Sequence, residues 1–168
     1  MTALRVLGAA LLLLAIGVPD ASGQMFVPTG ADTLRGLPGV ELIVDSVQSE
    51  LEDGGLTSAA LRADVAARLR KGGITLYPSQ VANPSPAKPY LYIALNALTL
   101  PAGAGYALGV QVHVRQILRS PVTNSNIVNA MTWDAHNVLV VQASDLDSVR
   151  AEVLTFIDLF VDDWTRVH

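Results

Sequence analysis

The chain has 168 residues, a formal net charge of −4 at pH 7, and no cysteine. An acidic balance without a basic stripe argues against a nucleic-acid partner. The lack of cysteine excludes disulfides, thiolate zinc ligands and the lipid-attachment residue of a lipoprotein.

The first 23 residues are predicted to be a secretory signal peptide. One positive charge, Arg5, precedes an apolar run over 6–18, and small residues, Ala21 and Gly23, occupy the positions that a signal peptidase reads. The run is shorter than the roughly 20 residues that a membrane-spanning helix needs. We therefore expect cleavage after Gly23, no stable membrane anchor afterwards, and a periplasmic or secreted protein.

Residues 24–38 are predicted to form a flexible arm, because prolines and glycines interrupt any regular period there. A single α+β domain is then expected over 39–168, a common length for one domain. Its first strand covers 39–47, where the sequence GVELIVDSV has high strand propensity.

The first helix is predicted from an apolar stripe, Leu61, Val65 and Leu69, at four-residue spacing. Thr57 or Ser58 is expected to cap its start. The glycine pair at 72–73 is expected to end it. A second strand should follow over 74–77.

Two further strands are predicted over 90–100 and 106–118, joined as a hairpin by PAGAG. The second of them alternates regularly, so one of its faces should be buried. The preceding segment, 78–89, has four prolines and is predicted to be a long exposed loop.

The last part of the chain is predicted to contain strand-like segments over 127–133 and 138–141, separated by a tight turn at 134–137. A helix then runs to the end, and a capping box of Ser144 and Asp147 should start it. The resulting fold is a two-layer α+β sandwich of order βαββββα. Its four to five strands are mostly antiparallel, and two helices pack on one face.

The sequence predicts no catalytic residues, no metal site and no cofactor. No serine lies in a Gly-x-Ser-x-Gly elbow. Asp134 and His136 are too few for a zinc site, which needs three or four ligands. We expect His113 to be an ordinary surface histidine on its strand and His168 to fray at the chain end.

The sheet face opposite the helices is the candidate protein-binding surface, because tyrosine and arginine combine apolar area with hydrogen bonding. Ordinary solvent-facing strand residues would show the same pattern. The candidate residues on this face are Tyr90, Tyr92, Gln111, His113 and Arg115. Glu41 and Asp45 of the first strand are predicted to lie on the same face.

Four segments, GLPGVELIVDSV, GLTSAALRADVAARLRKGGI, YLYIAL and FIDLFVDDW, together resemble a small exported bacterial family with no assigned activity. The resemblance covers residues 36–168 and rests on the order of elements and on helix and glycine positions. The element order is also similar to that of periplasmic assembly domains, such as the amino-terminal domain of TolB and the lipoprotein LptE. Those families dock onto envelope proteins and are not enzymes. No functional residue of theirs has a counterpart motif here.

Three hypotheses follow. The first is a non-enzymatic domain that docks onto another cell-envelope protein. The second is a small-molecule binder or hydrolase with a site beneath the 78–89 loop, because long loops in compact domains are often functional. The third is a self-associating protein that pairs through the edges of its sheet.

Overall fold

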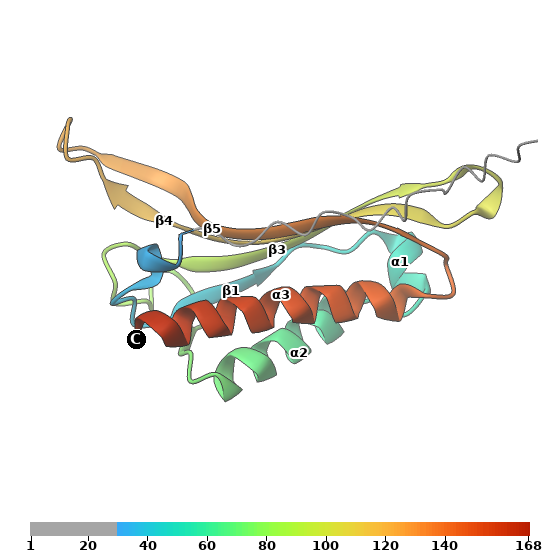
Figure 1. The fold of residues 1–168 in the computed structure, drawn as a ribbon, viewed down its shortest axis with the longest axis horizontal. Coiled ribbons are helices and arrows are strands. Elements are labelled where there is room, and N and C mark those ends of the chain that lie inside the picture. Colours follow the sequence, from blue (N-terminus) through green and yellow to red (C-terminus); the bar gives the residue numbers. More distant parts are fainter. Residues whose placement is uncertain (1–29) are drawn as a thin grey trace, which may run out of the picture.

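A computed structural model of the chain describes residues 30–168 (Figure 1). The predicted signal peptide, 1–23, and the first part of the predicted arm, 24–29, lie outside the described residues. Among residues 30–168, no helix combines the length and the apolar character that crossing a membrane requires.

Five strands form one sheet in the order β2-β1-β3-β4-β5. Their bounds are β1 Val40–Val44, β2 Leu76–Tyr77, β3 Tyr90–Thr99, β4 Tyr106–Arg119 and β5 Asn126–Val141. β1 pairs in parallel with β2 and β3, whereas the long β3–β4 and β4–β5 pairs are antiparallel. The predicted, mostly antiparallel sheet is confirmed.

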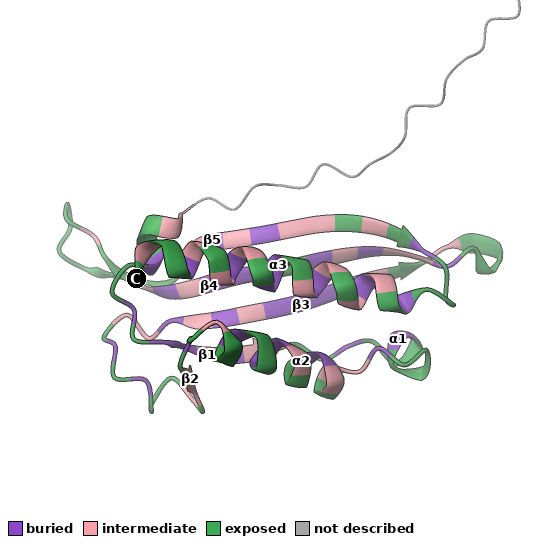
Figure 2. Ribbon diagram, turned by 60° about the horizontal axis from the view of Figure 1, so that its bottom comes forward, coloured by how far each residue is buried: buried purple, intermediate pink, exposed green. Residues whose placement is uncertain are grey.

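Two long helices, α2 (Ser58–Lys71) and α3 (Leu146–Val167), lie side by side against the same face of the sheet (Figures 1 and 2). The predicted α+β class, with its helices on one face, is therefore confirmed. Shorter turns of helix complete the fold: α1 Ser49–Asp53, η1 Ala31–Leu34 and η2 Pro101–Gly103.

The core lies between the sheet and the two helices. On β4, alternate residues from Leu108 to Val114 are fully buried, as period-2 alternation requires. α3 turns a continuous buried stripe toward the sheet, from Leu146 to Trp164 (Figure 2). The centre of this contact is an edge-to-face pair of Trp133 and Phe160, with ring centroids 5.1 Å apart.

The two helices begin in different ways. Of the two predicted caps, Thr57 and Ser58, it is Thr57 that caps α2, because its Oγ1 accepts from the backbone N–H of Ala60 at 3.2 Å. The predicted capping box at Ser144 is wrong: Asp145 takes the N-cap position of α3, without a side-chain cap. Ser148 instead donates to the Asp145 carbonyl at 2.7 Å.

β5 is one continuous strand, so the predicted tight turn at 134–137 is wrong. Asp and Asn favour turns because their side chains compete for backbone groups. Here those side chains have other partners. Asn137 donates to Glu152 of α3 at 2.8 Å and accepts from the Val138 N–H at 2.9 Å. The irregularities of the β4–β5 strand pair are register shifts between Val114 and Arg115 and between Gln116 and Leu118 of β4.

Residues 30–38 are packed on the core, in contrast to the predicted flexible arm. Leu34 is fully buried and Leu37 nearly so. The chain end closes over this segment in place of the predicted fraying. His168 stacks on Trp164 with ring centroids 4.2 Å apart. Its Nε2 lies 3.1 Å from the Leu37 carbonyl oxygen.

The proline-rich loop 78–89 folds back on itself and is less exposed than predicted. Asn83 is fully buried beneath it and accepts from the Ser85 N–H at 3.0 Å. Lys88 donates to the Asn83 carbonyl at 2.6 Å, and Ala87 accepts from the Ile117 N–H at 2.7 Å. The buried Asn83 thus ties the loop to itself through both its side chain and its carbonyl.

Candidate functional site

The candidate site lies on the sheet face turned away from α2 and α3, which we call the distal face. Strand register brings its side chains into rows across β3, β4 and β5. One row is Tyr92, His113 and Asp134, and its neighbour is Tyr90, Arg115 and Met131. A third row contains Gln111 and His136. The register therefore brings all five sequence-predicted residues together.

Three of these residues form a connected series of contacts. The Tyr92 and His113 rings stack with centroids 5.1 Å apart and planes 21° apart. The Arg115 Nε–H donates to His113 Nε2 at 3.0 Å. The Tyr92 hydroxyl donates to Asp45, just beyond β1, at 2.5 Å. The series joins the end of β1 to the centre of the sheet.

The other two predicted residues lie apart from this series. The Tyr90 hydroxyl donates to Asn129 of β5 at 3.1 Å. Gln111 is exposed beside His136.

His113 is buried, with 6% of its surface exposed, so the expectation of an ordinary surface histidine is wrong. An arginine can only donate hydrogen bonds. Because Arg115 donates to Nε2, that nitrogen carries the lone pair and the imidazole is neutral. Burial, and then the Arg115 charge, lower the pKa of His113 below 6.5, while Asp134 opposes this shift.

The Tyr92–Asp45 hydrogen bond has opposite effects on its two members. It lowers the pKa of Asp45, and the bond from the Ser46 N–H adds to this. It raises the pKa of Tyr92. Both shifts favour a protonated hydroxyl bound to an ionised carboxylate, so this end of the series is fixed near neutral pH.

A hollow of about 290 Å³ lies beside this series on the distal face. Its lining residues are Gln111, Val112, His113, Arg115, Met131, Asp134, Ala135 and His136. Within it, His136 Nδ1 lies 3.1 Å from Asp134 Oδ2. Sequence reasoning missed Met131, Asp134 and His136 as members of this face. Alternation along an uninterrupted β5 was the signal that could have found the last two.

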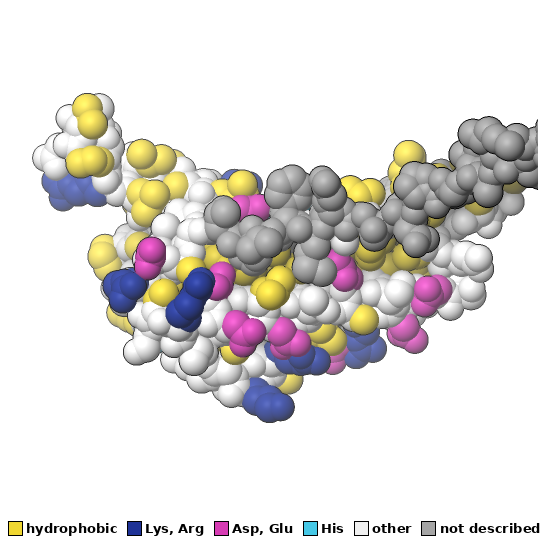
Figure 3. Space-filling view, viewed as in Figure 1, with side chains coloured by type: hydrophobic (Ala, Val, Ile, Leu, Met, Phe, Trp, Pro, Cys, Tyr) yellow, Lys and Arg dark blue, Asp and Glu magenta, His cyan; other side chains and the backbone are white. Residues whose placement is uncertain are grey.

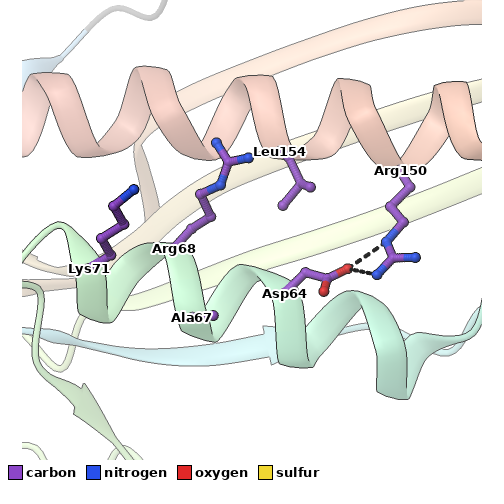
Figure 4. A pocket seen from close by; sticks show the side chains of 6 residues that line it. All are labelled: Asp64, Ala67, Arg68, Lys71, Arg150 and Leu154. Carbon is purple, nitrogen blue, oxygen red and sulfur yellow. Dashed lines mark hydrogen bonds and ion pairs between the residues drawn. The ribbon is translucent and has the colours of Figure 1, made fainter.

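A second hollow, of about 390 Å³, lies between α2 and α3 (Figure 4). Its arginines are already paired: the Arg150 Nε–H donates to Asp64 at 2.5 Å, and Arg68 pairs with Asp158. These ion pairs cross-link the two helices on the solvent side of the core. We interpret the groove as helix packing and not as a binding site.

The described residues contain no group of three or more His, Cys, Asp or Glu side chains that could hold a metal ion. Comparisons with known protein families, with curated proteins and with solved structures found no match to this chain. The resemblance to exported bacterial proteins stays a prediction.

The burial of neutral His113 predicts a pH-dependent stability. Between its lowered folded pKa and the unfolded value near 6.5, the unfolded state binds more protons. This residue's stabilising contribution is complete above about pH 6.5 and falls as pH drops toward the folded pKa. The substitution His113→Gln removes the titrating imidazole and, with it, this pH-dependent contribution to the free energy of unfolding. Urea unfolding at about pH 7.5 and about pH 5.5 should show a smaller loss for the variant than for the natural chain. Equal losses would show that His113 does not titrate in this way.

Proposed function

We propose that the protein is an exported, non-enzymatic domain that docks onto another cell-envelope protein through its distal face. The observation that carries the proposal is the series from Asp45 through Tyr92 and His113 to Arg115. It holds aromatic and guanidinium groups in place on the face that α2 and α3 leave uncovered. Such side chains, fixed before binding, are typical of the residues that dominate protein interfaces.

Exposed apolar side chains at the two ends of the distal face support a protein partner. Leu98 and Val140 lie in one row at the β3–β4 end and are 68% and 73% exposed. Met131, 56% exposed, lies in the row of Arg115, and Val128, 67% exposed, lies further along β5 toward the tip of the β4–β5 hairpin. Figure 3 shows hydrophobic side chains on that projecting tip. A polar, aromatic centre between apolar ends suits a broad protein contact better than a small ligand.

Two parts of this proposal come from the sequence. The predicted signal peptide, 1–23, supports export and an envelope partner. The lack of a recognisable catalytic motif supports a binding role.

Capture from the native cell envelope tests the proposed function. The tagged full chain, cross-linked in place, should recover one dominant and reproducible partner. Tyr92→Ala and Arg115→Ala should each weaken the capture by about tenfold, the effect of losing one significant interface residue. The matched control is Arg70→Ala on α2, an exposed arginine far from the distal face.

The control variant should capture as the natural chain does, and all three variants should retain its melting temperature within a few degrees. Unchanged capture by both distal-face variants would remove this face from the function. The absence of any dominant partner would overturn the docking proposal itself.

A further inference from the structure

Arg115 is one of four arginines in residues 30–168 that form no ion pair with a carboxylate; the others are Arg62, Arg70 and Arg119. Four arginines form ion pairs: Arg35 with Asp32, Arg68 with Asp158, Arg150 with Asp64 and Arg166 with Asp163. Arg115 uses its Nε on a neutral histidine ring instead. Within residues 30–168, its two Nη groups have neither a hydrogen-bond nor an ion-pair partner. The positive charge of Arg115 is thus uncompensated at short range.

The guanidinium of Arg115 is nevertheless held in one orientation. Its Nε–H is fixed on His113, which is stacked on Tyr92, and Tyr92 is in turn bound to Asp45. Each contact in this series restricts the side-chain conformations of the free protein, so that less conformational entropy is lost on binding. The Nη groups remain available as a planar pair of donors, the geometry that binds both oxygens of one carboxylate.

The hollow beside Arg115 has room for an acidic side chain. Its volume of about 290 Å³ is bounded by Met131, which offers an apolar wall to the methylene groups of such a side chain. Asp134 also lines the hollow but is directed to His136, 3.1 Å away. It forms no ion pair with Arg115, so it leaves the arginine charge in place.

From this unpaired, pre-oriented guanidinium at the edge of a hollow, we infer that Arg115 binds a carboxylate presented by the docking partner. The occupant is an Asp or Glu side chain on an exposed segment of that protein. The inference rests on the proposed function and specifies the chemistry of its contact. A phosphate would also be attracted by the charge. The planar donor pair fits both anions, but the nearby Asp134 carboxylate repels a phosphate more strongly and so favours the singly charged carboxylate.

Blocked peptides provide a test that needs no identified partner. A short peptide of alternating valine and glutamate is titrated into the full chain and compared with its valine–glutamine counterpart, acetate and inorganic phosphate. The readouts are the NMR signals of the Arg115 Nε–H and the His113 ring. We expect the glutamate peptide to shift both signals and to bind at least tenfold more tightly than the glutamine peptide.

Three variants make the test specific to Arg115. Arg115→Gln should abolish the preference for glutamate, and Arg115→Lys should weaken it because lysine lacks the planar donor pair. The matched control is Arg119→Gln, four residues along β4, where Arg119 donates to Asn124 at 2.8 Å. The control should bind the glutamate peptide as the natural chain does.

Several outcomes would overturn the inference. They are equal binding of the two peptides, binding that survives Arg115→Gln, and tighter binding of phosphate than of the glutamate peptide. Acetate binding as tightly as the peptide would also count against it, since the hollow would then be a general anion site. The envelope capture separates this inference from the docking function. Capture lost in Tyr92→Ala but kept in Arg115→Gln would leave docking in place and refute the carboxylate contact.

Discussion

Replacing Trp133 with alanine is expected to destabilise the fold by about 3–5 kcal/mol, the range for removing a buried aromatic side chain. Trp133 is fully buried on β5 and packs edge-to-face on Phe160 of α3. Its Nε1–H also donates to Asp163 at 2.8 Å. The substitution removes the ring contact and leaves a cavity. It also removes one of the two donors to Asp163, whose side chain is only 16% exposed and which Arg166 still contacts. Chemical denaturation followed by circular dichroism measures the change.

Trp133→Phe is the matched control for this experiment. It keeps an aromatic ring against Phe160 but loses the donor to Asp163, so its cost should be clearly smaller than that of alanine. The difference in the free energy of unfolding between the two variants isolates the contribution of the packing of β5 on α3. Equal costs would show that the hydrogen bond to Asp163, and not the buried ring, holds this strand to the helix.

Much of the fold could be predicted because its local patterns agree with its packing. Alternation along β4 identified the buried side of the sheet, and the stripe on α2 identified a helix with a correct cap at Thr57. β5 could not be predicted as one strand, since Asp134 and Asn137 favour turns. Their partners, His136 on β5 and Glu152 on α3, are set by strand register and helix packing. Tertiary context here overrides local propensity.

The candidate site was likewise predictable where local sequence patterns determine it and not where tertiary contacts do. Period-2 alternation was enough to place Tyr92, His113 and Arg115 on one face. It could not show that His113 is buried and neutral. That state depends on the stacking of His113 on Tyr92 of the neighbouring strand β3 and on the hydrogen bond from Arg115, two residues along β4. Asp45 was assigned to the correct side of β1. Its contact with Tyr92 depends on the parallel pairing of β1 with β3, which the sequence does not specify.

Gly39→Ala is expected to cost about 3 kcal/mol or more, from roughly 1–3 kcal/mol of backbone strain and a similar overpacking cost. Gly39 has a φ of +150°, and an added Cβ would lie 2.3 Å from the Thr75 carbonyl oxygen and 2.8 Å from the Thr75 Cβ. The backbone cannot move aside easily. The same Thr75 oxygen accepts from the N–H of Val40, at 3.0 Å, and Val40 is fully buried.

Gly36 provides the control in the same segment, because its φ of +72° is also positive but an added Cβ would meet nothing within 4 Å. Gly36→Ala should therefore cost only the backbone term, about 1–2 kcal/mol. Thermal unfolding of the two variants measures the difference, which reports how closely the start of β1 approaches the residue before β2. Similar melting temperatures for both would mean that Thr75 yields to the new methyl group. The parallel β1–β2 contact would then be looser than the close approach at Gly39 implies.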